Sequence, residues 1–168
     1  MNGEYFFNFE KLAYVKGEKP AGCIFCMIRD RNPEVIDLSV YRDEFFVVSV
    51  NLYPYNPGHL LIFPLRHIED IRDYSPLENR RLEELLRYFL DLSDQSYSPQ
   101  GYNIGYNMGT PAGGSIAHLH LHLIPRYHRE LGIADLIAGK RVLVEDPRQT
   151  ARKLKEKIAQ VPFSSAIS

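Results

Sequence analysis

The run AHLHLHLIPRY at residues 117–127 limits what this chain can fold into more than any other segment, because histidine and leucine alternate in it without a break. Side chains on a β-strand point alternately to the two faces of its sheet. The alternation therefore predicts a strand with a buried leucine face and a histidine face: Leu119, Leu121 and Leu123 against His118, His120 and His122. Three imidazoles in a row cover a sheet poorly without a polar partner. Metal ligands, catalytic groups and a buried polar stripe are the open interpretations.

The length and charge of the chain narrow its class. A chain of 168 residues is expected to form one domain over 1–168 and to bury roughly 70% of its unfolded surface. A formal net charge of -1 argues against polymeric nucleic acid or a membrane surface as partner. No apolar run reaches the ~20 residues of a membrane span. The N-terminal residues 1–12 lack the features of a signal peptide, so a cytoplasmic location is expected.

The remaining elements follow from apolar runs and turn residues. Strands are predicted over 45–50, 59–64 and 102–109, and a short helix or turn over 22–30. A further helix is predicted over 147–160. Strands with such varied connections favour an α+β fold, with a mainly antiparallel sheet and helices outside it.

The segment 74–94 carries the clearest helix signal. Ser75 suits the N-cap, Pro76 suits the first helical position, and Glu78 completes a capping box. Leucine and phenylalanine recur at helical spacing after it, which predicts one face packed on the core.

A glycine-rich segment leads directly into the histidine run. Gly109, Gly113 and Gly114 allow positive φ and a close approach of the backbone. Exposed N–H groups in such a turn bind anions, and Ser115 and Asn107 add neutral donors. A flexible loop is the alternative. Beside three histidines, a phosphate cradle facing a histidine nucleophile is the better account, because an ordinary imidazole pKa of about 6.5 leaves the ring neutral in the cell.

The two cysteines, Cys23 and Cys26, form a single C-x-x-C. In a reducing compartment this pattern indicates half of a zinc site or a redox pair before it indicates a structural disulfide. A zinc site needs two more ligands from elsewhere in the chain.

The motifs together resemble a known family. HLHLHLIP is similar to the signature of the histidine triad (HIT) superfamily of nucleotide hydrolases and transferases. The likeness runs over residues 22–127 and includes CIFC, NLYPYNPGHLLIFPLRH and GYNIGYNMGTPAGGSIAHLHLHLIPRY. Within the superfamily these runs look most like the diadenosine tetraphosphate phosphorylase branch. The resemblance implies the HIT-like fold, with about five mainly antiparallel strands and flanking helices.

The resemblance also implies roles for individual residues. His120 would be the nucleophile that forms a covalent nucleotidyl-histidine, His122 would contact the phosphate or the leaving group, and His118 completes the triad. Asn51 would hold the ribose. The other residues implied to bind the nucleotide are Leu52, His59, Asn107, Gly113, Gly114, Ser115, Phe25 and Ile28.

The same resemblance gives the cysteines two partners. It implies a structural zinc held by Cys23, Cys26, His67 and His118, a closed set of four ligands. A metal-free C-x-x-C, with His118 hydrogen-bonded to orient its neighbour, is the alternative. The implied reaction needs no catalytic metal. A zinc hydrolase using all three triad histidines is a rival, but a strand would spread them over about 13 Å.

The implied substrate is an adenine dinucleoside polyphosphate or a related AMP ester, with water or inorganic phosphate as the acceptor. A purine nucleoside phosphoramidate hydrolase and a nucleotide-binding regulatory protein of low turnover are the alternatives. The resemblance further implies a homodimer whose two sheets join edge to edge.

Overall fold

The computed structural model describes residues 21–128 and 145–165, which form one five-stranded sheet in the order β1-β2-β3-β5-β4. Every neighbouring pair of strands is antiparallel. The strands are β1 (Ser39–Arg42), β2 (Phe46–Val50), β3 (Leu60–Pro64), β4 (Gly101–Tyr106) and β5 (Leu121–Arg126). The helices are α2 (Ile24–Arg29), α3 (Pro76–Tyr97) and α5 (Pro147–Gln160), with 3-10 turns η1 (Ile71–Asp73) and η2 (Thr110–Ala112). The predicted α+β class is confirmed.

The observed elements largely agree with the predicted ones, but the strand predicted over 102–109 runs from Gly101 to Tyr106. The helix at 147–160 has the predicted bounds. The helix predicted within 74–94 begins at Pro76 with the full capping box, in which the Ser75 hydroxyl accepts from Glu78 N and the Glu78 carboxylate accepts from Ser75 N. Strand β1, a short strand interrupted by a bulge, was not predicted.

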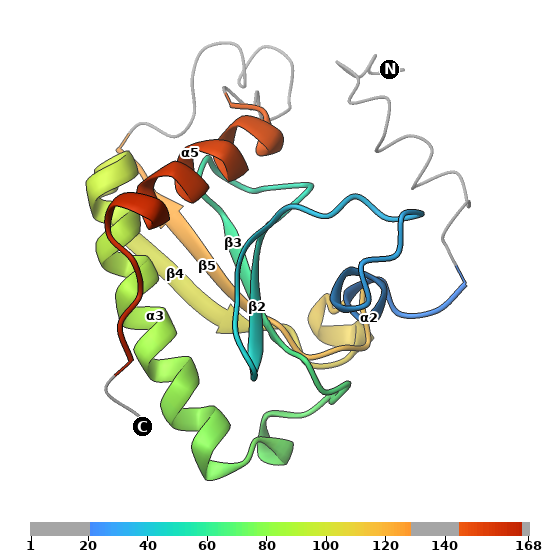
Figure 1. Ribbon diagram of the computed structural model, residues 1–168. Helices are drawn as coiled ribbons and strands as arrows, with labels where there is room; N and C mark the ends of the chain where they lie inside the picture. The colour runs from blue at the N-terminus through green and yellow to red at the C-terminus, as the bar shows by residue number, and fades with distance from the viewer. Residues whose placement is uncertain (1–20, 129–144, 166–168) are drawn as a thin grey trace, which may run out of the picture.

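The two faces of the sheet carry separate hydrophobic clusters. Helices α3 and α5 cover one face and α2 lies on the other (Figure 1). The larger cluster includes Phe46, Leu85, Phe89 and Leu154, so it fills the space between the sheet and the two long helices. The smaller cluster lies under α2 and consists of Phe25, Ile28, Val47, Leu61 and Phe63. Among the described residues, fewer apolar side chains therefore pack on the α2 side, and this is the side where the histidines lie.

The histidine run departs from the prediction in one respect. Strand β5 begins at Leu121, so His122 is the one triad histidine that lies in it. Upstream, the backbone N–H of Leu119 donates to Ile68 O, in the loop after β3, at 2.7 Å instead of joining a strand ladder. The alternation of faces still holds, because the three leucines of the run belong to the larger cluster.

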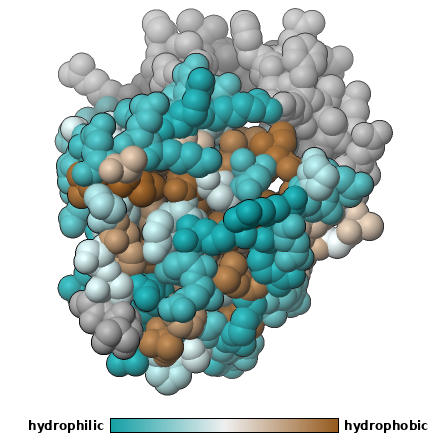
Figure 2. Space-filling view, viewed as in Figure 1, coloured by the Kyte–Doolittle hydropathy of each residue, from teal (hydrophilic) through white to brown (hydrophobic). Residues whose placement is uncertain are grey.

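The described surface is mixed in character. In the view of Figure 2 hydrophilic residues cover most of the surface, and hydrophobic residues form separate small areas. Among residues 21–128 and 145–165, no helix is long and apolar enough to cross a membrane. The N-terminal segment 1–12, in which we predict no signal peptide, lies outside the described residues.

Candidate functional site

A cavity of about 440 Å³ opens on the α2 side of the sheet. The register of the strands determines which side chains form its floor. Ser49 pairs with Leu61, and Leu61 pairs with His122. Directly paired residues point to the same face of a sheet, so these three side chains form one row across β2, β3 and β5. The lining of the cavity combines apolar and polar residues. Its lining includes Phe25, Ile28, Leu52, Asn107, Ser115, His120 and His122.

His120 lines the cavity with one ring nitrogen already hydrogen-bonded. Its Nδ1 lies 2.8 Å from the backbone oxygen of His118. A carbonyl oxygen only accepts, so Nδ1 carries the proton and donates. Burial lowers the pKa of His120, which favours the neutral ring. The ring of Phe25 packs edge-on against it, with centroids 4.9 Å apart. The Nε2 atom of His120 therefore carries a lone pair, as a nucleophile requires.

His122 is backed by a second histidine. His59 Nε2 lies 3.0 Å from His122 Nδ1. His59 is fully buried and reaches the cavity through His122 rather than lining it. Burial, then the neighbouring His122 and His120, lower the pKa of His59 to about 3, and burial lowers that of His122 to about 4. Both rings are therefore neutral near pH 7.

The glycine-rich turn has the predicted backbone conformation, but two of its N–H groups donate within the turn rather than facing an anion: Gly113 N donates to Thr110 O and Gly114 N to Gly109 O. Gly113 ends η2 with φ of 87°, a conformation that side chains rarely adopt. A Cβ on Gly114 would lie 2.7 Å from the Asn107 backbone oxygen, so this position requires glycine. Asn107, Gly113 and Ser115 line the main cavity, whereas Gly114 lines a second cavity of about 360 Å³ that shares Asn107 and Ser115 with the first.

Asn51 also lines the main cavity, beside Leu52. Its side-chain oxygen accepts from the backbone N–H of Tyr53 at 3.0 Å, and its amide nitrogen lies 3.3 Å from His59 Nδ1. The residue implied to hold ribose thus also contacts the histidine behind the cavity.

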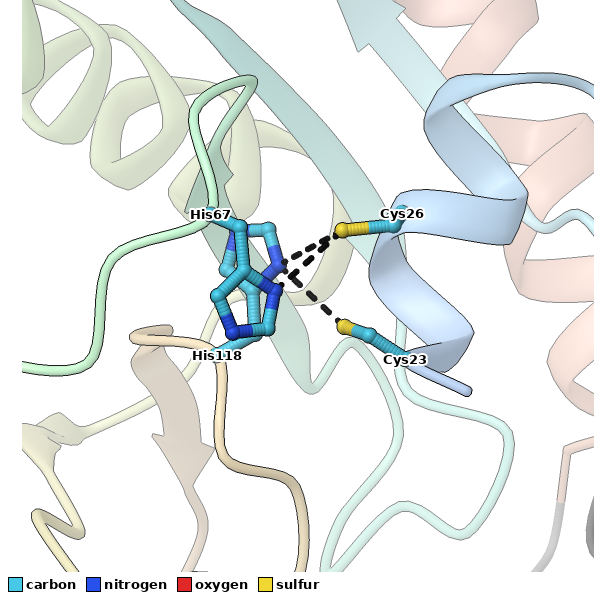
Figure 3. A group of neighbouring side chains, drawn as sticks. All are labelled: Cys23, Cys26, His67 and His118. Atoms are coloured by element: carbon cyan, nitrogen blue, oxygen red, sulfur yellow. Dashed lines mark hydrogen bonds between the residues drawn. The ribbon is translucent and has the colours of Figure 1, made fainter. Parts of the chain in front are cut away.

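The two cysteines face two histidines from other parts of the fold (Figure 3). Cys23 Sγ lies 3.3 Å from His118 Nδ1, and Cys26 Sγ lies 3.3 Å from His67 Nδ1 and 3.6 Å from His118 Nδ1. The four ligand atoms all lie within 4.8 Å of one another. We call Cys23, Cys26, His67 and His118 the Cys2His2 group.

The Cys2His2 group suits a metal ion. Bonds of ~2.3 Å to sulfur and ~2.0 Å to nitrogen in a tetrahedron place the ligand atoms about 3.5 Å apart, which is the observed sulfur–nitrogen spacing. His118 Nε2 lies 2.9 Å from Pro64 O, so its proton is on Nε2 and Nδ1 turns a lone pair toward the sulfurs. Metal-bound histidines usually donate their other N–H in this way. Neither His120 nor His122 belongs to the group among the described residues, which counts against the rival with three triad ligands.

Sequence reasoning missed several residues of the cavity. Ser49 is 3% exposed and lines it together with Val35 and Tyr55. Ser49 had a detectable signal, since it is the polar residue in the run FFVVSV and shares a face with Val47. Val35 and Tyr55 lie in irregular segments whose course no periodicity predicts.

The chain belongs to the HIT domain family, whose model matches residues 32–129. A Mycobacterium tuberculosis protein named AP-4-A phosphorylase is 36% identical over 126 residues, covering 74% of this chain and 65% of that protein. A Schizosaccharomyces pombe bis(5'-nucleosyl)-tetraphosphatase (asymmetrical) is 33% identical over 97 residues, covering 58% of this chain and 53% of that protein. The matches thus span about half to two thirds of these relatives.

Solved structures agree with the family assignment. A Zn-bound histidine triad family protein from Mycobacterium smegmatis superposes with a TM-score of 0.67 at 26% identity. The superposition covers 83% of this chain and 95% of that one. The predicted family and its fold are confirmed.

Proposed function

We propose that this chain transfers or hydrolyses nucleotidyl groups of a dinucleoside polyphosphate, through a covalent intermediate on His120. The observation that carries the proposal is the Nε2 lone pair of a neutral His120, a residue that lines the cavity and is held there by the His118 carbonyl. The names of the two curated relatives give the substrate class.

Different residues of the cavity lining contact different parts of the proposed substrate. The base lies against Phe25, Ile28 and Leu52, and Asn51 holds the ribose. The phosphate chain lies along the turn that contains Asn107, Gly113, Gly114 and Ser115, where the side-chain donors of Asn107 and Ser115 offset its charge.

The proposed reaction has two displacements at the α-phosphorus. His120 Nε2 attacks, the N–P bond forms, and the bond to the bridging oxygen breaks, so the remaining phosphate chain leaves with its electron pair. Water or inorganic phosphate then attacks the same phosphorus and the N–P bond breaks, which returns the lone pair to His120. When water is the acceptor, the proton that it loses passes to solvent. The Nδ1 proton of His120 stays on the ring, hydrogen-bonded to the His118 carbonyl, throughout. His122 donates a hydrogen bond to a phosphate or leaving-group oxygen.

Product analysis tests this proposal. The protein is incubated with diadenosine tetraphosphate, with and without inorganic phosphate. A nucleoside diphosphate that appears only with phosphate marks a phosphorylase, and a mononucleotide without phosphate marks a hydrolase. His120→Ala is expected to lower turnover at least about 1,000-fold, because it removes the nucleophile. His128→Ala, at an exposed position, serves as the control. If His120→Ala turns over substrate as fast as the wild-type protein, the mechanism is wrong. If the wild-type protein binds diadenosine tetraphosphate without turning it over, a regulatory role is favoured instead.

We further propose that the Cys2His2 group holds a structural zinc ion. The ligand spacing, the orientation of His118 and the zinc bound by the similar Mycobacterium smegmatis protein support this choice. A bound zinc would fix the position of His118, and through its carbonyl that of His120. A reducing compartment such as the cytoplasm fits, because Cys23 and Cys26 are not joined in a disulfide.

A homodimer joined through β4 completes the proposal. β4 is an edge strand of the sheet, and Ile104 on it is 45% exposed. Open edges with apolar side chains favour pairing with a second copy. Sedimentation equilibrium tests this, and a monomer at micromolar concentration contradicts it.

A further inference from the structure

Helix α2 is too short to hold its own position on the sheet. It has six residues, Ile24–Arg29, whereas an isolated helix needs about 12–15 residues to be stable in water. The turn that ends it contains Arg31 with a φ of 56°, a left-handed conformation in which glycine is the usual residue. Contacts with the rest of the fold must therefore keep α2 in place.

Arg42, on strand β1, bonds the C-terminal end of α2. It pairs with Val47, which belongs to the hydrophobic cluster under α2, so the register turns Arg42 toward this helix. Arg42 Nη1 donates to Arg29 O at 2.6 Å and Nη2 donates to Ile28 O at 2.9 Å. The last carbonyls of a helix carry partial negative charge and lack partners within the helix. One planar guanidinium thus satisfies two adjacent carbonyls and brings a favourable charge.

The middle of α2 forms a wall of the cavity. Phe25 and Ile28 line the cavity and are 3% and 5% exposed. On the N-terminal side, Cys23 and Cys26 face the histidines of the Cys2His2 group. At the other end, Arg42 bonds the backbone of Ile28 itself. The wall is therefore held at both ends by groups from other parts of the fold.

We propose that Arg42 is a positioning residue that holds the C-terminal end of α2, and thereby fixes the apolar wall against which the base of a nucleotide packs. The inference rests on the proposed function for the identity of the ligand. Arg42 does not belong to the cavity lining among the described residues, so it acts through α2. Asn107 and Ser115, assigned to the phosphate chain, lie between β4 and β5. Loss of Arg42 should therefore weaken the binding of the base and spare the binding of phosphate.

Titrations with adenosine monophosphate and with inorganic phosphate test this separation. In Arg42→Gln the Kd of adenosine monophosphate should rise about 10-fold, the effect of losing a hydrogen bond from a charged group, and the Kd of phosphate should change less than about twofold. An unchanged Kd for adenosine monophosphate overturns the proposal. An equal rise for both ligands also overturns it, because the whole cavity would then be damaged rather than one wall.

Hydrogen exchange tests the anchoring of α2 without any ligand. The backbone N–H of Arg31 donates to Ile28 O and that of Asn32 donates to Met27 O, both in the last turn of α2. In Arg42→Gln these two amides should exchange about 10-fold faster, whereas amides between β2 and β3 should exchange as in the wild-type protein. Unchanged exchange at Arg31 and Asn32 overturns the proposal, whether or not the protein binds a nucleotide.

Arg42→Lys and Arg87→Gln are the matched variants. A lysine keeps the charge but replaces the fork of donors by one ammonium, so its Kd for adenosine monophosphate should lie between those of the wild type and Arg42→Gln. If Arg42→Gln does not fold, a wild-type Kd in Arg42→Lys overturns the proposal. Arg87 pairs with Glu83 on α3, which covers the other face of the sheet (Figure 1). Arg87→Gln should leave both Kd values and the exchange of α2 unchanged.

Steady-state kinetics separate this inference from the proposed function. With diadenosine tetraphosphate, Arg42→Gln should raise KM about 10-fold and change kcat less than about threefold, because His120 keeps its bond to the His118 carbonyl. A fall in kcat at unchanged KM contradicts the positioning role. If the wild-type protein binds adenosine monophosphate but does not turn over diadenosine tetraphosphate, the proposed function fails and the positioning role stands.

Discussion

His118 and His122 lie four positions apart in one segment, yet they present opposite chemistry to their surroundings. Both rings carry their proton on Nε2. At His118 the Pro64 carbonyl accepts a hydrogen bond from that N–H at 2.9 Å, which leaves the Nδ1 lone pair for the cysteine side. At His122 the partner is His59: the Tyr55 backbone N–H donates to His59 Nδ1, so His59 Nε2–H donates to His122 Nδ1 at 3.0 Å. Among the described residues this leaves His122 Nε2–H buried without a partner. The hydrogen-bond partner of one ring nitrogen thus decides whether the other nitrogen carries a lone pair or an N–H.

The two histidines also differ in how firmly their surroundings hold them. The Cys2His2 group joins α2, the loop after β3 and the segment before β5. The His59–His122 pair joins only adjacent strands through hydrogen bonds. Loss of the first arrangement should therefore affect stability far more than loss of the second.

Of the substitutions that test this comparison, Cys26→Ala should change the stability of the protein most. If the Cys2His2 group holds zinc as proposed, removing one of its four ligands should abolish metal binding and lower the free energy of unfolding by more than about 4 kcal/mol. Metal analysis of the purified variant and thermal unfolding measure both quantities. Removing metal from the wild-type protein with a chelator should lower its stability in the same way, whereas wild-type metal content in the variant would rule out the Cys2His2 group as the binding site.

Acid should weaken the His59–His122 pair by a smaller, graded amount. The folded pKa values, about 3 for His59 and about 4 for His122, lie below the unfolded value of about 6.5, so the unfolded chain binds more protons as the pH falls. Stability should therefore decrease from pH ~6.5 toward 4, by at most about 1.4 kcal/mol per pH unit for each histidine.

Denaturant titrations at several pH values measure this slope. In His59→Gln the slope of stability against pH should be smaller by the contribution of one histidine. In His128→Gln, at an exposed position, the slope should be that of the wild-type protein. An unchanged slope in His59→Gln would mean that the pKa of His59 is the same in the folded and the unfolded chain.

Tyr55→Ala should give the smallest effect. The Tyr55 ring stacks on His59 with centroids 5.4 Å apart, a contact worth about 1 kcal/mol. The backbone N–H that faces His59 Nδ1 remains in the variant, so the ring protons should stay in place and kcat should change less than about threefold. A tautomer change in Tyr55→Ala would show that the ring, rather than the backbone, fixes His59.

Local sequence signals predicted much of the fold and of the site. The capping box at Ser75 and the alternating run at 117–127 are local signals, and they located α3 and the cavity-facing histidines. The strand β1 was missed, because four residues with a bulge carry too little pattern. The start of β5 was placed too early, because the bond from Leu119 to the distant Ile68 leaves no local trace.

The partners of the histidines were beyond the reach of local pattern. The carbonyls and N–H groups that set each ring are backbone atoms of His118, Pro64 and Tyr55, whose side chains give no hint of the role. Such contacts depend on where the backbone runs in three dimensions. The Cys2His2 group, by contrast, was predicted from the family resemblance, and the fold brings its four side chains together as expected.

The pairing of β3 with β5 also has a consequence for how the chain folds. His59 and His122, joined by a hydrogen bond, are 63 residues apart in the sequence, and α3 and β4 lie between them. Closing so long a loop costs entropy before any contact repays it, so such pairings form late. Helix α3 has local contacts and can form first. During refolding, helical signal should thus return before turnover does, and the return of activity should report the moment at which the middle of the sheet closes.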